Sequence, residues 1–140
     1  MEQGSAVKDF RARTCCFTGH REIPFLRRHH IAKVLKQELE KLIEQGVIYF
    51  GAGGALGFDT MAAQTVLSLK SKHPEIKLRA DKVKYTSIEY TSGCMHKRNR
   101  HLVDNSSVCV SYMTKNTGGT AYTVDYARKN HVRVINLAEL

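Results

Sequence analysis

Three short stretches of the sequence combine glycine with residues that can bind an anion. They read TGHR at 18–21, GAGGALGFD at 51–59 and TGGTAY at 117–122. Each follows a short apolar run and precedes a stretch with helical spacing. Glycines in such a turn allow backbone N–H groups to approach an anion, and the N-terminus of the next helix attracts the same anion. We therefore predict that these turns hold the phosphate groups of a ligand.

Each turn also has a simpler interpretation. Glycine is common in tight strand-to-helix turns for steric reasons alone. GAGGALGFD is not the dinucleotide-binding fingerprint, because Leu56 stands where that pattern needs its third glycine. Asp59 can cap the following helix or accept a hydrogen bond from a ribose hydroxyl. His20 and Arg21 can equally be a surface pair, and Thr120 can cap its helix or bind phosphate.

A fourth stretch places a basic residue beside a predicted core. Residues 94–104, CMHKRNRHLVD, have helical spacing, and Arg98 lies one turn from both Met95 and Leu102. A charge next to that buried stripe needs an anionic partner. The candidates are Asp125, in the helix that follows the third turn, and a phosphate of the ligand.

The elements that must position these residues alternate along the chain. An alternation of strands and helices predicts an α/β fold with a mostly parallel sheet. In such sheets ligands bind beyond the carboxyl ends of the strands, where the three turns lie. The predicted strands are 14–19, 47–54, 76–79, 82–87, 107–113 and 132–137, and the predicted helices are 25–45, 57–72, 94–104 and 119–130.

One junction breaks the alternation. Only four residues separate Leu78 from Val83, whereas neighbouring parallel strands need a crossover of roughly a dozen residues or more. The two segments therefore pair antiparallel, or one of them is not a strand, or a segment is missing between them.

The composition predicts one soluble, cytoplasmic domain. The chain has 140 residues, a usual length for a single domain, and residues 1–12 are expected to form a flexible N-terminal segment. No apolar run is long enough for a membrane helix or a signal peptide. The four cysteines have no metal-ligand spacing, so we predict reduced, mostly buried thiols and no metal site.

The charge balance indicates an anionic partner. Lys and Arg number 22 against 13 Asp and Glu, a formal net charge of +9, which favours nucleic acid or a phosphorylated small molecule. The aromatic residues are not interleaved with the charges as in single-strand binders, so nucleic acid is the less favoured of the two.

Four segments of the chain resemble the SLOG superfamily. They are CCFTGHR at 15–21, GALGFDTMAAQTVLSLK at 54–70, GCMHKRNRHLVDNSS at 93–107 and GGTAYTVDYA at 118–127. This Rossmann-like group includes the LOG phosphoribohydrolases, the DprA/Smf proteins and the YpsA-like proteins, and the chain is most similar to the YpsA-like branch. The resemblance implies a three-layer Rossmann-like fold and the binding of nucleotides or nucleotide-derived ligands.

The resemblance to LOG enzymes is only partial. Their motif M-H-x-R-K matches residues 95–98, but Asn99 replaces the Lys. Their motif P-G-G-x-G-T-x-x-E matches at the glycine pair 118–119, and Asp125 falls where the catalytic Glu stands. The shorter acid withdraws the carboxylate by one methylene, and a misplacement of about 1 Å can cost about a hundredfold in rate. If the protein is an enzyme, Arg98 and Asp125 are the expected catalytic pair of an N-glycosidic-bond hydrolase.

The resemblance also bears on the irregular junction. Relatives carry an extra loop and helix where Arg79-Ala80 joins the two segments directly here. The fold is therefore expected to be shortened between Leu78 and Val83. Such a shortening would open one side of the pocket, and it could expose surface that favours a homodimer.

Together these observations predict a single SLOG domain, spanning residues 1–140, that binds a nucleotide or ADP-ribose-like phosphorylated ligand for sensing or sequestration. The alternatives are a LOG-like phosphoribohydrolase acting on a nucleoside monophosphate, and DprA-like binding of single-stranded DNA. No cofactor is expected. The predicted ligand-binding residues are Thr18, Gly19, His20, Arg21, Gly51, Gly53, Gly54, Gly57, Asp59, Arg98, Asn99, Gly118, Gly119 and Thr120.

Overall fold

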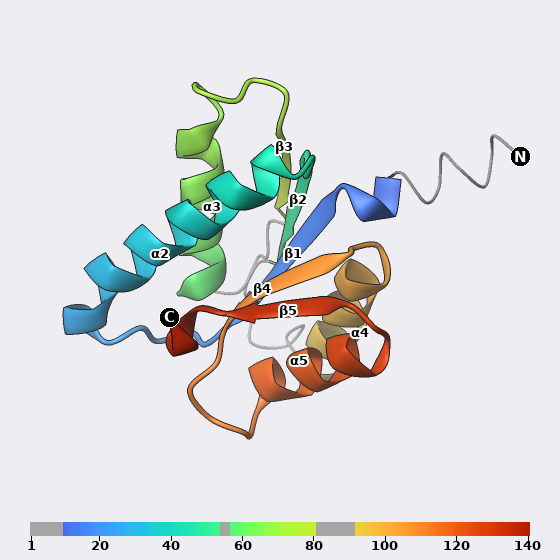
Figure 1. Cartoon of the computed structure of the whole chain (residues 1–140). Coiled ribbons are helices and arrows are strands. Elements are labelled where there is room, and N and C mark those ends of the chain that lie inside the picture. The colour runs from blue at the N-terminus through green and yellow to red at the C-terminus, as the bar shows by residue number, and fades with distance from the viewer. Residues whose placement is uncertain (1–9, 54–56, 81–91) are drawn as a thin grey trace, which may run out of the picture.

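The structure, a computed structural model, describes residues 10–53, 57–80 and 92–140 (Figure 1). The predicted alternation is confirmed within these ranges, and the strand predicted at 82–87 lies outside them. The strands are β1 (Thr14–Gly19), β2 (Tyr49–Ala52), β3 (Lys77–Ala80), β4 (Val108–Tyr112) and β5 (Arg133–Asn136), and the helices are α2 (Phe25–Glu44), α3 (Phe58–Leu69), α4 (Ser92–Asp104), α5 (Gly119–Lys129) and the short 3-10 helix η1 (Leu137–Glu139).

The five strands form one parallel sheet in the order β3-β2-β1-β4-β5. Helices α2 and α3 pack together on one face, and α4 and α5 pack together on the other (Figure 1). This arrangement confirms the predicted three-layer, Rossmann-like α/β fold. It also brings the carboxyl ends of all five strands to one edge of the sheet, which we call the carboxyl edge.

The larger core lies between the sheet and the α2–α3 layer. Helical spacing along α2 directs Ile31, Leu35, Leu39 and Leu42 inward, and all four are almost fully buried. They pack with Phe17 and other side chains of the sheet in one apolar cluster.

The smaller core lies under α4 and α5 and is built partly from cysteine. Successive residues of a strand point to opposite faces, so Cys15 joins the larger core while Cys16 joins the smaller one. Cys16 is the register partner of Cys109 on β4, and both are buried. These three thiols are free, as predicted, and burial raises the pKa of Cys15 well above its usual value. The side chain of Cys94 lies outside the described part of the chain.

The α4–α5 layer leaves part of its face of the sheet accessible. In the parallel register Thr14, Tyr49 and Lys77 are neighbours across β1, β2 and β3, and Arg79 on β3 is paired with Gly51. Lys77 and Arg79 are exposed, and these strands line a pocket beside α4.

Residues 10–12 differ from the flexible segment predicted there. They are helical, and the ring of Phe10 packs against Tyr49 at a centroid separation of 4.8 Å. Arg11 Nε donates to the carbonyl of Ser106 (3.2 Å) and Thr14 Oγ1 donates to the carbonyl of Phe10 (2.6 Å). These contacts attach the segment to β1 and to the end of α4.

None of the helices in the described ranges is both long enough and apolar enough to cross a membrane.

Candidate functional site

The strand order reverses between β1 and β4, and His20 connects the segments that follow these two strands. The chain leaves β1 towards α2 on one face and leaves β4 towards α5 on the other, the arrangement at which open α/β sheets bind ligands. The His20 N–H donates to the carbonyl of Tyr112 (3.2 Å), and His20 Nε2 accepts from the Thr114 N–H (2.9 Å). Partial burial, together with the nearby charge of Lys115, lowers the pKa of His20.

Two of the predicted binding glycines have a steric role. Gly57 has φ 81°, and a Cβ there would collide with the backbone carbonyl of Arg21. A Cβ on Gly19 would collide with the ring of Phe58. The Phe58 N–H donates to the carbonyl of His20 (3.2 Å), so the TGHR turn and the end of the 51–59 turn pack directly against each other. The steric interpretation of glycine therefore applies at these two positions.

Gly53 has different neighbours, which come from α3 and α4. A Cβ there would lie 3.1 Å from Asp59 Oδ2 and 3.6 Å from Asn99 Oδ1. Asn99 on α4 also donates through Nδ2 to Thr123 Oγ1 on α5 (3.2 Å), and Thr123 Oγ1 donates to the carbonyl of Gly119 (3.0 Å). The second turn, the basic helix and the third turn thus meet in one place, where the sequence predicted a ligand.

Asp59 does not occupy the capping position. The N-cap of α3 is Gly57, and Asp59 lies in the first turn of the helix, buried, with its carboxylate facing Gly53. The prediction that Asp59 caps this helix is therefore wrong.

The third turn ends at an accessible helix N-terminus. Gly118 is the N-cap of α5 with φ 92°, and no atom of the described residues outside its own chain neighbours lies within 4 Å of where its Cβ would be. Residues 117–119 are exposed, whereas Thr120 is buried. The first N–H groups of a helix have no partner within the helix, so this end of α5 can accept an anion.

Arg98 and Asp125 line different hollows. Asp125 is exposed and forms an ion pair with Lys129 (3.0 Å). It borders a shallow hollow with Gly118, Tyr122 and other residues of the third turn and α5. Arg98 is half-buried and lines the pocket on the face of the sheet. The arginine–carboxylate pair expected of a phosphoribohydrolase is therefore not formed between these residues.

The residues around the motifs of α4 and α5 hold the two helices together. His96 stacks on Tyr122 at a centroid separation of 4.1 Å, and Arg100 Nη1 donates to the hydroxyl of Tyr122 (2.7 Å). Tyr126 donates to Asp104 Oδ1 (2.7 Å), a bond that raises the pKa of Tyr126. Sequence reasoning missed Tyr122 and Thr123 as site residues, although both lie about one turn after Gly119.

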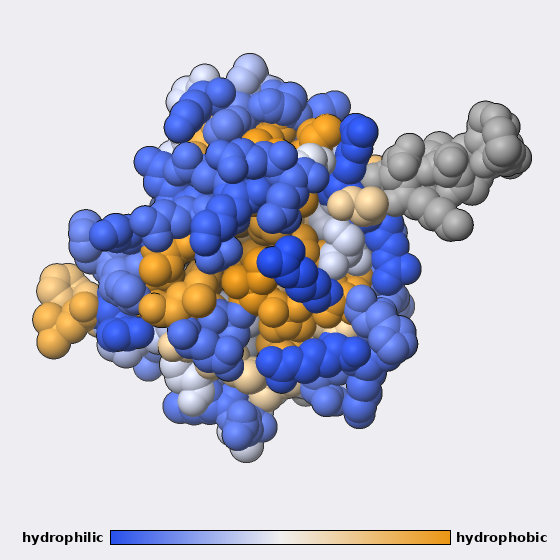
Figure 2. All heavy atoms as spheres, in the orientation of Figure 1, coloured by the Kyte–Doolittle hydropathy of each residue, from blue (hydrophilic) through white to orange (hydrophobic). Residues whose placement is uncertain are grey.

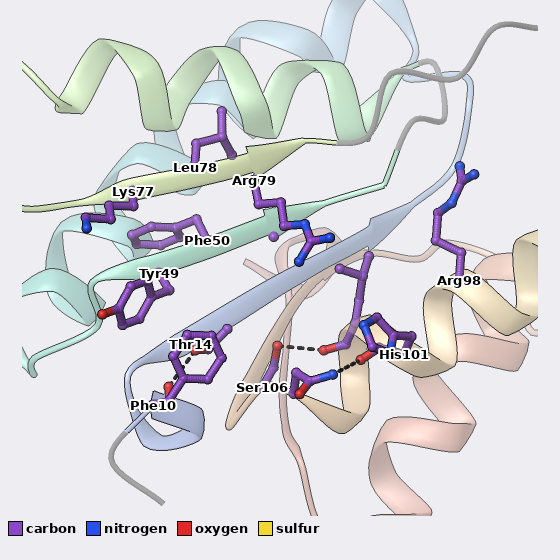
Figure 3. Close-up of a pocket in the computed structure, with 13 residues that line it drawn as sticks. Phe10, Thr14, Tyr49, Phe50, Lys77, Leu78, Arg79, Arg98, His101 and Ser106 are labelled. Atoms are coloured by element: carbon purple, nitrogen blue, oxygen red, sulfur yellow. Dashed lines mark hydrogen bonds between the residues drawn. The ribbon is translucent and has the colours of Figure 1, made fainter. Parts of the chain in front are cut away.

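A pocket on the α4 side of the sheet was not predicted from the sequence, although two of the residues that line it were. We call it the face pocket; it has a volume of about 390 Å³ and lies between β1, β2 and β3 and the side of α4 (Figure 3). Gly51 and Arg98 were predicted as ligand residues, but their neighbours here were not. Those neighbours are Phe10, Thr14, Tyr49, Phe50, Lys77, Leu78, Arg79, His101, Leu102, Asn105 and Ser106.

The remaining predicted residues are placed as follows. Thr18 is buried on β1, and Arg21 borders a broad basic groove at the carboxyl edge with Arg27, Arg28 and Lys115. Gly54 lies outside the described residues. Within the described ranges, no cluster of three or more His, Cys, Asp or Glu could hold a metal ion.

Comparison with known proteins supports the predicted relationship. Residues 15–80 match the YpsA family, described as the YspA SLOG family. UPF0398 proteins of Halalkalibacterium halodurans and Brevibacillus brevis are 43% and 42% identical over 49 and 48 residues. The matched segment spans only 26% of each of these relatives and about a third of this chain (35% and 34%).

Two solved structures share the fold at low sequence identity. DNA processing protein A from Helicobacter pylori, which binds single-stranded DNA, superposes with a TM-score of 0.62 at 17% identity, covering 93% of this chain and 66% of that one. The corresponding protein from Streptococcus pneumoniae gives a TM-score of 0.60 at 14% identity, covering 91% of this chain and 50% of that one. Residues 15–80 of this chain therefore match the YpsA SLOG family, and the chain shares the fold of the two DprA structures.

Proposed function

We propose that this domain binds a phosphorylated, nucleotide-like ligand at the carboxyl edge of its sheet. The observation that supports this most directly is the convergence of Gly53, Asn99, Thr123 and Gly119. These residues come from three segments that are far apart in the sequence. They meet where parallel α/β sheets bind ligands.

The proposed ligand has its phosphate at the accessible N-terminus of α5. Backbone N–H groups at such an end attract anions. Arg98 on α4, which lines the face pocket, adds a positive charge on the same face of the sheet. Asn99 offers both a donor and an acceptor to the sugar or base.

The proposed role is to hold the ligand, for sensing or sequestration, rather than to cleave it. A LOG-like reaction needs a carboxylate beside the sugar, and Asp125 instead faces outward in an ion pair with Lys129. The geometry therefore supports binding better than hydrolysis.

The test begins with the purified protein. Small molecules released on denaturation are identified by mass spectrometry, and nucleotides and ADP-ribose derivatives are screened by thermal shift and calorimetry. We expect an intact nucleotide-like compound to copurify or to raise the Tm. Absence of both effects across the panel would overturn the proposal.

Two substitutions make the test specific. Gly119→Val adds a side chain at the proposed phosphate position, where the nearest protein atom to a Cβ is His96 Nε2 at 4.0 Å. It should weaken binding by at least about tenfold, since blocking a charge-assisted hydrogen bond costs about 1.5–3 kcal/mol. Arg133→Ala, an exposed cation at the start of β5, is the control and should leave binding unchanged. Release of a free base that Asp125→Asn abolishes would instead identify a hydrolase.

A further inference from the structure

The face pocket combines an aromatic surface with a row of cations. Its floor is formed by β1, β2 and β3, and its wall is the side of α4 that carries Arg98, His101 and Leu102 (Figure 3). Gly51 leaves the floor flat, because a Cβ there would lie 3.1 Å from Leu102 Cδ2 and narrow the space between β2 and α4.

The aromatic surface is formed by Phe10 and Tyr49. Their rings lie 4.8 Å apart at 39°, and Phe10 keeps 46% of its surface exposed although it belongs to the pocket wall. The hydrogen bonds of Arg11 to Ser106 and of Thr14 to Phe10 hold this segment in place. An exposed aromatic surface that is already positioned is suited to stack a flat ring.

The cations lie along the neighbouring strand. Lys77 and Arg79 are two residues apart on β3 and point to the same face, so their Cα atoms are about 6.6 Å apart. In Figure 3 the guanidinium of Arg79 points into the middle of the pocket, and Arg98 and His101 lie at its α4 side. No carboxylate occurs among the thirteen described residues that line the pocket. The charge of the pocket therefore favours an anion.

The size of the pocket limits the ligand to one small unit. Its volume of about 390 Å³ lies near the lower end of the range of about 300–1,000 Å³ for small-molecule sites. A flat ring, a negative charge and a small volume together describe a single nucleotide.

We propose that the face pocket binds one nucleotide unit, with the base against Phe10 and Tyr49 and the phosphate between Arg79 and Arg98. The face pocket is a second site, separate from the one proposed at the N-terminus of α5, so the inference goes beyond the proposed function and assigns a ligand to a surface that the sequence did not indicate. The unit can come from a free mononucleotide or from one residue of a single strand. The chemistry of recognition is the same in both.

The experiment compares four probes by calorimetry: a purine mononucleotide, ribose 5-phosphate, inorganic phosphate and a short oligodeoxythymidylate. We expect the mononucleotide to bind at least about fivefold more tightly than ribose 5-phosphate, because stacking of a base on an aromatic ring contributes about 1–3 kcal/mol. Tyr49→Ala should weaken binding of the mononucleotide by at least about fivefold. Arg79→Ala should weaken binding of both the mononucleotide and ribose 5-phosphate. If the oligonucleotide binds with a steep dependence on salt, the source is a single strand.

The controls separate a local loss from a loss of folding. Tyr49 is half-buried, so Phe10→Ala, at a more exposed ring, is a second variant on the same surface, and the Tm of each unliganded variant is measured. Lys36→Ala is the matched control for Arg79→Ala. It removes an exposed cation of α2, on the opposite face of the sheet. If ribose 5-phosphate binds as well as the mononucleotide and Tyr49→Ala changes neither, the face pocket inference is wrong while the proposed function stands. If no probe binds, the face pocket inference is wrong, and the site at the N-terminus of α5 is judged separately by the wider ligand panel and by Gly119→Val.

Discussion

At the scale of single residues, His20 joins the end of β1 to the segment that follows β4 through two hydrogen bonds. Its Nε2 can accept a hydrogen bond from Thr114 only while the imidazole is neutral. Partial burial and the charge of Lys115 both favour that neutral form, because both disfavour a second positive charge.

This predicts an acid-sensitive step in stability. A histidine whose pKa is lowered on folding resists protonation in the folded state, so its full contribution is present above the unfolded pKa of about 6.5 and decreases as the pH falls below that value. His20→Gln offers an oxygen acceptor that does not titrate. We expect thermal melts of the wild type to lose stability from about pH 6.5 downward, relative to the variant. Parallel curves for the two proteins would contradict this role for His20.

The glycines show how one residue type serves two purposes in one fold. Gly19 and Gly57 are required by the close approach of backbone and aromatic ring, whereas Gly118 and Gly119 border open space. Composition alone cannot separate these cases, because the difference lies in what surrounds the missing Cβ.

At the scale of elements, α4 and α5 act as one unit above the sheet. Their contacts include a stacked ring pair and three side-chain hydrogen bonds between the helices. The bond from Asn99 to Thr123 is the one nearest the proposed ligand. It fixes the α4 motif relative to the start of α5.

We therefore expect Thr123→Val to lower the free energy of unfolding by about 1–2 kcal/mol, because it removes the acceptor of Asn99 while keeping the volume of the side chain. Thr65→Val is the matched control. Thr65 donates to the carbonyl four residues earlier, as Thr123 does, but among the described residues it makes no side-chain bond to another helix. Urea denaturation measures both variants, and equal losses would show that the bond between the helices contributes little.

At the scale of the whole molecule, the larger core and the face pocket lie on opposite faces of the sheet. The α2–α3 face holds the larger apolar cluster, and the α4–α5 face holds a smaller one beside the face pocket. The space-filling view shows hydrophilic residues along α2 with apolar surface between it and the lower part of the molecule (Figure 2). A rigid layer on one face can support an accessible site on the other.

This division predicts which shortened side chains lower the free energy of unfolding. Leu35→Ala removes a fully buried side chain from the larger core and should cost about 2–5 kcal/mol. Leu67→Ala, on the neighbouring helix α3 but 56% exposed, should stay within about 0.5 kcal/mol. Urea denaturation of both proteins is the measurement. A small loss for Leu35→Ala would show that the core relaxes around the cavity.

By itself, the sequence determined the order of the described elements and the position of the glycine turns at the carboxyl ends of the strands. Helical spacing in α2 and the alternation of apolar strands with helices are local patterns, and parallel topology follows from them with few alternatives. The glycine turns were therefore found from sequence, as was the position of Asn99 near them.

Only the tertiary structure decided which residues meet. Phe10, Tyr49 and Arg79 are separated by long stretches of chain, and the sequence showed no interleaving of aromatic and basic residues. The register of β1, β2 and β3 brings them together on one face. Arg98 and Asp125, in contrast, were paired by motif, but their helices direct them to different hollows. Side-chain direction depends on strand register and helix rotation, and packing sets both over distances that a local pattern does not reach.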